Sequence, residues 1–402
     1  MALLSVTEAL ERVLADAVPL SAEEVPLEKA DGRVLAYDLK ARRTQPPADV
    51  SAMDGYAVRA GDVAQAPARL RVIGEVPAGR PFNASVGPGE AARIFTGGFL
   101  PDGADVVVVQ ELTRREGNWV EVQKPIVAGR NVRRRGLDFN KGDKLFAKGH
   151  LFTARDLALV AGMNHPLVPA YRKPKVALFA TGDELVPPGN EPGPGQIVYS
   201  NGFALAALIR EEGGDVIDLG VVGDKLDATI AAVRDARDRG ADILVTTGGA
   251  SVGDYDFVNR ALAAEGLALS FWKIAMRPGR PLMHGRLGAM QVLGVPGNPV
   301  SSYVCAFLFL VPLIRKLTGR HDLVPPTETA TLGRDLPEND ERADYLRATL
   351  SNGGGGLVAT PFPVQDSSMM APLAKADCLL IREPHVSPAK AGSPCSIIRF
   401  AR

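Results

Sequence analysis

The glycine-rich turn at residues 246–256, Thr-Thr-Gly-Gly-Ala-Ser-Val-Gly-Asp-Tyr-Asp, carries the residue types of a phosphate-binding site. It lies between an apolar run that predicts a buried strand and a segment that predicts a helix. Gly248 and Gly249 lack a Cβ, so a ligand can approach the backbone, and the following helix N-terminus favours an oxyanion. Asp254 and Asp256 would repel a bare phosphate, but Mg²⁺ between the carboxylates and the phosphate removes that repulsion. A tight turn with an acidic helix cap is the alternative interpretation of this stretch alone.

Two further predicted strands also end in polar, glycine-rich turns. Residues 176–180 lead into Thr-Gly-Asp-Glu at 181–184, and residues 292–295 lead into Pro-Gly-Asn-Pro at 296–299. Between the second and third strands, residues 276–281 place two arginines around a Pro-Gly pair. Ligands of parallel α/β sheets bind beyond the carboxyl ends of the strands, so we expect these turns to form one site.

The elements around these turns alternate in the order expected of a parallel sheet. Residues 203–212 and 226–239 predict helices, and residues 216–222 predict a strand between them. Such alternation indicates parallel strands joined by crossover helices. Asp224 directly follows the predicted strand, where it can face the same sheet edge as Asp254, although a helix N-cap would also explain an aspartate there.

The flanking regions have a different character. A helix is predicted at residues 5–17, where Ser5 and Glu8 form a capping-box pattern. Short strand-like runs separated by turn residues predict an inserted β-domain before the α/β region and a small β-barrel after it. We predict four regions, namely a linker or dimerisation region at residues 1–50 with 136–174, an inserted β-rich domain at 51–135, an α/β domain at 175–324 and a C-terminal barrel at 325–402.

Composition narrows the functional classes. The chain has 402 residues, 46% of them hydrophobic, and its formal net charge is zero. The length allows two to four domains, and the charge balance does not favour nucleic-acid or membrane partners. Three cysteines without paired spacing argue against a disulfide framework and a zinc site. No secretory signal pattern opens the sequence, and the apolar run at 303–314 is too short for a membrane span, so we expect a cytoplasmic protein.

Several of these motifs carry a family resemblance. Residues 246–256 with 296–301 resemble the molybdopterin-binding fold of molybdenum cofactor biosynthesis. Residues 51–57, 93–97 and 133–136 lie outside that fold, and with it they resemble the longer MoeA family of molybdopterin molybdenumtransferases, also seen as the C-terminal part of gephyrin. The resemblance covers nearly the whole chain in the right order. It implies a central three-layer α/β molybdopterin-binding domain within a multidomain α/β and β protein.

The resemblance also implies a reaction. The family inserts molybdenum from molybdate into adenylylated molybdopterin, releases AMP and depends on Mg²⁺. It implies a homodimer whose cleft uses both subunits, with molybdopterin-synthesis proteins and cofactor acceptors as further partners. Molybdopterin adenylylation, a non-enzymatic gephyrin-like scaffold and tungsten as the metal are the alternatives.

Roles for Asp54, Asp138, Arg347 and Ser368 come from the resemblance, since the residues alone would equally suit a turn, a solvated charge run or a barrel surface. The sequence departs from the family pattern at Leu137, where an acidic residue is more common. The predicted catalytic residues are Asp54, Asp138, Glu184, Asp224 and Asp256, and the predicted metal ligands are Asp224, Asp254 and Asp256. The predicted substrate-binding residues are Thr96, Thr181, Gly182, Asp183, Thr247, Gly248, Gly249, Ser251, Gly253, Arg277, Arg280, Pro296, Gly297, Asn298, Ser301, Arg347 and Ser368.

Overall fold

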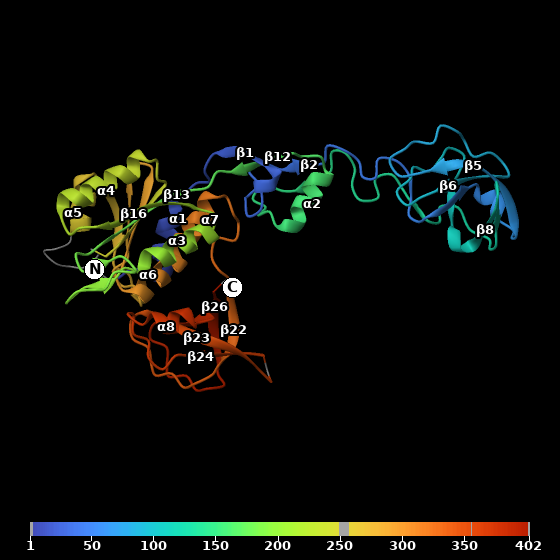
Figure 1. Cartoon of the computed structure of the whole chain (residues 1–402). Coiled ribbons are helices and arrows are strands. Elements are labelled where there is room, and N and C mark those ends of the chain that lie inside the picture. The colour runs from blue at the N-terminus through green and yellow to red at the C-terminus, as the bar shows by residue number, and fades with distance from the viewer. Residues whose placement is uncertain (1–2, 249–256, 355, 401–402) are drawn as a thin grey trace. The chain divides into compact units, whose positions relative to one another are not determined.

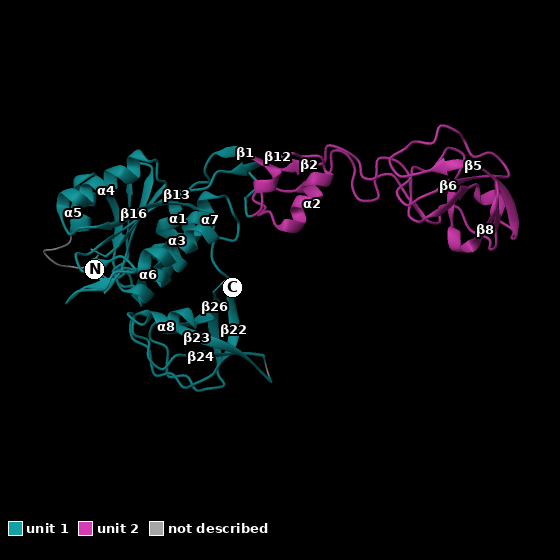
Figure 2. Cartoon of the chain, in the orientation of Figure 1, with its two compact units in different colours: residues 1–23, 32–36, 169–402 teal, residues 24–31, 37–168 magenta. Residues whose placement is uncertain are grey.

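A computed structural model describes residues 3–248, 257–354 and 356–400 of the chain. The chain forms two compact units (Figure 2). Unit 1 comprises residues 1–23, 32–36 and 169–402, and unit 2 comprises residues 24–31 and 37–168. The finer division into four regions stays a prediction.

Unit 1 contains the predicted α/β sheet, in which four neighbouring strands are parallel and two more continue the sheet antiparallel. In spatial order the strands are β16 (Asp215–Val222), β13 (Lys175–Thr181), β17 (Ile243–Thr247), β21 (Met290–Val295), β20 (Met283–Leu287) and β18 (Ala268–Trp272). The inner parallel strands β13, β17 and β21 are buried on both faces, so they read as continuous apolar runs rather than alternating ones.

Two hydrophobic cores lie on opposite faces of this sheet. Leu178 packs into one core and its neighbour Phe179 into the other, as the two-residue period of a strand requires. The first core includes helices α1 (Val6–Ala15), α3 (Asn201–Glu211), α6 (Pro299–Cys305) and α7 (Val311–Leu317). The second includes α4 (Leu226–Asp238) and α5 (Phe257–Ala264), as Figure 1 shows. The three-layer architecture predicted from the sequence is therefore confirmed.

Two details of the helices follow from their sequences. Ser5 and Glu8 form the predicted capping box at the start of α1. The segment Pro299–Leu317, which joins α6, the π-helical turn η4 (Ala306–Leu310) and α7, is long and apolar enough to cross a membrane by length and composition alone. However, 83% of its apolar window is buried inside the protein, so it is a core helix.

The C-terminal part of unit 1 is the predicted closed barrel. Its five strands pair in the order β23, β24, β22, β26 and β25, and β25 pairs again with β23. Their bounds are β22 (Thr327–Leu332), β23 (Ala343–Gly353), β24 (Gly356–Pro361), β25 (Cys378–Arg382) and β26 (Pro394–Arg399), with helix α8 (Met370–Ala374) before β25. The short strand β19 (Met276–Arg277), which follows the α/β strand β18, pairs parallel with β23. It attaches the barrel to the α/β domain.

Unit 2 contains a second six-stranded sheet, with its own buried valine-rich clusters. In spatial order its strands are β7 (Val106–Val109), β4 (Gly55–Val58), β6 (Glu90–Ile94), β5 (Ala68–Val76), β9 (Trp119–Val122) and β8 (Thr113–Glu116). The remaining elements of unit 2 are η1 (Leu27–Lys29), β2 (Leu39–Lys40), β3 (Val50–Ser51), η2 (Ala60–Val63), η3 (Gln110–Leu112), β10 (Val132–Arg133), β11 (Lys144–Phe146) and α2 (Ala154–Gly162). Strands β1 (Ala22–Pro26) and β12 (Leu167–Tyr171) lie where the chain passes between the units. In unit 1, the short strand β14 (Leu185–Val186) pairs with β15 (Ile197–Val198).

Candidate active site

The carboxyl ends of the four parallel strands lie side by side, so the turns that follow them meet at one sheet edge. Thr247 at the end of β17 is level with Ala180 in β13 and with Val295 in β21. Gly248 has a φ of 85°, which favours glycine, and a Cβ on it would lie 2.7 Å from the carbonyl oxygen of Thr181. A Cβ on Gly297 would lie 3.5 Å from the Cα of Gly248. Three predicted turns therefore touch, and their glycines allow the close approach.

Three predicted carboxylates gather at the same edge. The backbone N–H of Asp224 donates to Asp183 Oδ1 at 3.1 Å, and the N–H of Asp183 donates to Asp224 Oδ2 at 3.4 Å. Gly182 lies against Glu184, because a Cβ on Gly182 would lie 2.6 Å from both carboxylate oxygens of Glu184. Burial raises the pKa of Asp224, and the charges of Asp183 and Glu184 raise it further. Within residues 3–248, 257–354 and 356–400, no cationic side chain forms an ion pair with these carboxylates.

The turn after β21 contacts a loop of the barrel. The Asn298 side chain donates to Ser367 Oγ at 3.0 Å, and the backbone N–H of Val300 donates to the Ser367 carbonyl at 3.0 Å. On the other side of the turn, the Asn201 side chain donates to the Gly297 carbonyl at 2.7 Å. The turn at residues 296–299 is therefore held from α3 and from the barrel. Asn201 was not predicted, and it is distinguished in the sequence only by its place at the start of a helix.

Two predicted anion donors are buried. Arg347 is 1% exposed, and its guanidinium donates to the Met369 carbonyl at 2.8 Å and the Asp366 carbonyl at 2.9 Å. The expectation that Arg347 offers its charge to a substrate is therefore corrected, since its donors order the loop that carries Ser368. Ser301 lies inside α6 and is only 5% exposed, so its hydroxyl is not on an open surface. The Ser368 hydroxyl donates to Asp366 Oδ1 at 2.6 Å and remains exposed with its loop.

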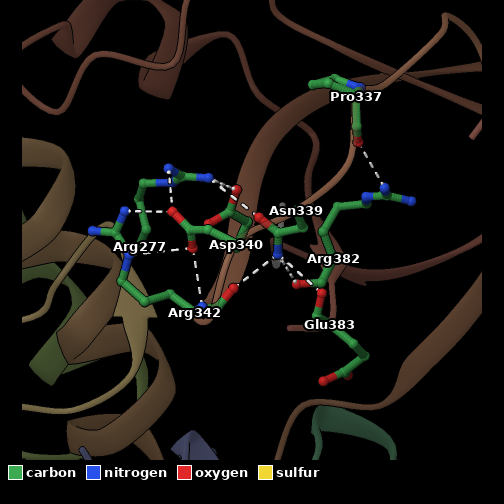
Figure 3. A network of polar contacts seen from close by, with 8 residues as sticks. Arg277, Pro337, Asn339, Asp340, Arg342, Arg382 and Glu383 are labelled. Atoms are coloured by element: carbon green, nitrogen blue, oxygen red, sulfur yellow. Dashed lines mark hydrogen bonds and ion pairs between the residues drawn. The ribbon is translucent and has the colours of Figure 1, made fainter. Parts of the chain in front are cut away.

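The two arginines of residues 276–281 have different environments. Arg277 donates to Asp340 Oδ2 and to Asn339 Oδ1, both at 3.2 Å (Figure 3). It also pairs with Asp344. Arg280 is exposed, and among the described residues its side chain has no hydrogen-bond or ion-pair partner. Both arginines were predicted to bind substrate, and Arg277, although its side chain is 47% exposed, is paired with barrel carboxylates. Asp340 and Asp344 were not predicted, since no local pattern relates them to a residue more than sixty positions earlier.

In unit 2, the structure joins two residues that the sequence suggested separately. Asp54 Oδ1 accepts from the backbone N–H and from the hydroxyl of Thr96, each at 2.7 Å. These two bonds, with the nearby charge of Arg93, lower the pKa of Asp54. Asp54 directly precedes β4, whose strand partners are β6 and β7, so the Asp-Gly pair is not the tip of a hairpin. Asp54 is therefore a fixed, ionised carboxylate beside Thr96.

The arginine run of unit 2 is partly neutralised. Arg134 pairs with Asp49 at 2.5 Å, and the backbone N–H of Arg135 donates to the other oxygen of Asp49 at 2.8 Å. Asp138 is exposed on the loop that follows. The cluster therefore supplies less free positive charge than the sequence suggests.

Five predicted site residues, Gly249, Ser251, Gly253, Asp254 and Asp256, lie outside the described residues. Thr247 is described and buried at the end of β17. Among the described residues, no group of three histidine, cysteine, aspartate or glutamate side chains is arranged to hold a metal ion. The sheet edge as described thus offers the three carboxylates of Asp183, Glu184 and Asp224 beside a glycine-lined backbone.

The sequence matches known protein families along almost the entire chain. Three family models match in order, namely the MoeA N-terminal region (domain I and II) at residues 4–163, the probable molybdopterin binding domain at 177–316, and the MoeA C-terminal region (domain IV) at 329–400. The chain is 42% identical over 336 residues to a molybdopterin molybdenumtransferase of a Nostoc species, covering 82% of this chain and 77% of the relative. It is 36% identical over 384 residues to the Bacillus subtilis protein of the same name, covering 94% and 89%.

A solved structure also matches along the whole length. The molybdopterin biosynthesis MoeA protein of Pyrococcus horikoshii superposes with a TM-score of 0.87 at 33% sequence identity, and the match covers 100% of both chains. The likeness therefore extends to every region described above.

Proposed function

The chain belongs to the MoeA family of molybdopterin molybdenumtransferases, and we propose that it inserts molybdenum from molybdate into adenylylated molybdopterin with release of AMP. The observation that supports this proposal most strongly is the meeting of four strand ends at one edge, where Thr181, Gly248 and Gly297 are in contact. Exposed backbone N–H groups and glycines at such an edge suit the phosphates of an adenylylated substrate. Full-length similarity, including the barrel and unit 2, favours the transferase over an adenylyltransferase.

We further propose that Mg²⁺ binds at this edge. Its preferred ligands are hard oxygens, and in phosphate-processing sites it takes one or two carboxylates and completes its shell with phosphate oxygens and water. Asp224, Asp183 and Glu184 supply such oxygens, and burial together with the charges of Asp183 and Glu184 raises the pKa of Asp224. The predicted ligands Asp254 and Asp256 would add to this set. When bound, the ion would neutralise negative charge that develops as the phosphoanhydride breaks.

The residues of this chain have separate tasks in that reaction. The backbone around Gly248 and Gly297 binds and orients the phosphates. Arg280 is an exposed cation that would hold molybdate, because a guanidinium donates bidentately to oxyanions. Molybdenum is substrate here, and it leaves on the pterin dithiolene. Asp54 and Thr96 complete the cleft from a partner subunit of a homodimer, and the enzyme works in the cytoplasm.

A reconstitution with purified components tests this function. The protein is incubated with adenylylated molybdopterin, molybdate and Mg²⁺, and AMP is quantified by chromatography while active cofactor is measured by activation of a cofactor-free molybdoenzyme. AMP and active cofactor should appear together, and omission of molybdate should abolish the active cofactor. AMP release without any cofactor, or adenylylation of free molybdopterin, would contradict the proposal.

A further inference from the structure

The guanidinium of Arg277 donates to three acceptors on the barrel. Its Nη1 donates to Asp340 Oδ2 at 3.2 Å, and its Nη2 donates to Asn339 Oδ1 at 3.2 Å (Figure 3). Its Nη2 also pairs with Asp344. The backbone supports the same contact, because Arg277 in β19 is the strand partner of Asp344 in β23. Three of the possible N–H bonds of Arg277 thus go to the barrel, although its side chain is 47% exposed.

Other residues of the barrel hold these acceptors in place. Asn339 is 6% exposed, and its side-chain amide donates to the carbonyls of Arg342, Arg382 and Glu383 at 2.8, 3.1 and 2.9 Å. Arg342 fixes Asp340 through its Nη2 at 2.7 Å and its backbone N–H at 3.0 Å. Hydrogen bonds within the barrel therefore anchor the acceptor side of the network.

Asp344 shows what Arg277 compensates. It is 5% exposed, and its Oδ1 atom is buried without a hydrogen-bond partner. A buried carboxylate that loses its cationic partner is strongly destabilised, whereas the intact pair is nearly neutral in energy. Loss of the Arg277 contact would therefore leave the Asp344 carboxylate buried without its cationic partner.

A second contact links the same two bodies at the proposed active site. The loop that carries Ser367 accepts from Asn298 and from the backbone N–H of Val300. Arg347 orders that loop from inside the barrel. The position of the barrel on the α/β domain therefore decides whether Ser367 and Ser368 reach the turn at residues 296–299.

We propose that Arg277 is a positioning residue, which fixes the barrel so that the Ser367 loop holds the turn after β21 in its substrate-binding geometry. This assignment rests on the proposed function for its effect on turnover, but not for its effect on structure. It differs from the assignment of Arg277 as a molybdate ligand in one respect. If Arg277 is a positioning residue, removing its carboxylate partners should impair its function. If Arg277 is a molybdate ligand, the same removal should free its guanidinium for the anion.

A double-mutant cycle distinguishes these assignments. The variants are Arg277→Gln, Asp344→Asn and the double variant, with Asp340→Asn as a milder substitution and Arg277→Lys as the conservative one. Arg399→Gln is the matched control, because Arg399 pairs with Glu328 at 2.8 Å on the exposed surface of the barrel. The measurements are hydrogen exchange of peptides covering residues 298–304 and 364–370, turnover, and the molybdate concentration at half-saturation.

We expect both single substitutions to speed exchange in the two peptides and to lower turnover by about 10-fold, with half-saturating molybdate changed less than about 2-fold. The double variant should be no worse than either single one, and Arg277→Lys should recover part of the loss. The Arg399→Gln control should match the wild type in both peptides.

The proposal is overturned if Asp344→Asn and Asp340→Asn leave exchange unchanged while Arg277→Gln raises half-saturating molybdate. Hydrogen exchange needs no substrate, so it tests the positioning role even if the proposed reaction fails. If Asp344→Asn does not fold, Asp340→Asn and Arg277→Lys still decide the question.

Discussion

The sheet edge and the Arg277 network are both rich in carboxylates, yet their charges are balanced differently. At the edge, Asp224 lies near two other carboxylates, and burial with their charge raises its pKa. In the network, Arg342 and Arg277 lower the pKa of Asp340 to about 2. Among the described residues, the edge carboxylates have no cationic partner, whereas the network carboxylates pair with Arg277 and Arg342. The fold itself supplies the cations of the network, and the proposed Mg²⁺ would supply the one at the edge.

The largest effect should come from substitutions at the edge. Asp224→Asn or Glu184→Gln removes a charge that orients the metal–phosphate unit, and loss of one aligned electrostatic group costs about 10²–10³ in rate. Cofactor formation is measured at saturating substrates, with the melting temperature as a check on folding. Asp335→Asn, at an exposed barrel carboxylate paired with Lys390, is the control. Wild-type rates of cofactor formation in both edge variants would contradict a role of the sheet edge in the reaction.

The next largest effect concerns Arg280. Arg280→Ala should raise half-saturating molybdate by roughly 10- to 150-fold, because a charge-assisted hydrogen bond contributes about 1.5–3 kcal/mol. Saturating molybdate should partly restore turnover. Titration of molybdate at saturating adenylylated pterin makes the measurement, and an unshifted half-saturation point would exclude Arg280 as a molybdate ligand.

Sequence patterns were sufficient to predict that the turns of the sheet edge lie together, but not to predict the Arg277 network. Thr181, Gly248 and Gly297 could be placed together because parallel strands align their carboxyl ends whatever the details of packing. Asp344 and Asn339 could not be related to Arg277, because polar pairs between distant strands leave no periodic trace. Arg347 shows the same limit, since burial of an arginine depends on loop carbonyls that no sequence pattern reveals. The pairing of Asp54 with Thr96 also needed the three-dimensional structure.

A smaller effect tests whether Asp54 and Asp224 share a cleft across a dimer. In a mixed dimer of Asp54→Asn and Asp224→Asn subunits, one of two shared clefts would keep both carboxylates. Random mixing makes half of the dimers mixed, so roughly a quarter of wild-type activity should return. Inactive mixtures, with mixed dimers demonstrated by differential tagging, would place both residues in a cleft of one chain.

The smallest effects concern stability and should have opposite signs. The depressed pKa of Asp340 contributes stability above its unfolded pKa, and that contribution is lost as the pH falls through about 2. Asp340→Asn should therefore destabilise at neutral pH by less than about 1 kcal/mol, since the pair is partly exposed. The raised pKa of Asp224 has the reverse sign, so Asp224→Asn should slightly stabilise the fold at neutral pH. Denaturant unfolding at pH 7 and at pH 2 measures the free energy of unfolding of both variants. A change of the same sign in the two variants at pH 7 would contradict the contrast.

The most direct test of the contrast is a Mg²⁺ titration of AMP release by the wild type, Asp224→Asn and Asp344→Asn. If the edge carboxylates hold the cation, half-saturating Mg²⁺ should rise by about 10-fold or more in Asp224→Asn, because one of few charged ligands is lost. It should stay at the wild-type value in Asp344→Asn, whose turnover falls for a positional reason. An unchanged Mg²⁺ dependence in Asp224→Asn, or an equal shift in both variants, would contradict the assignment of the sheet edge as the metal-dependent site.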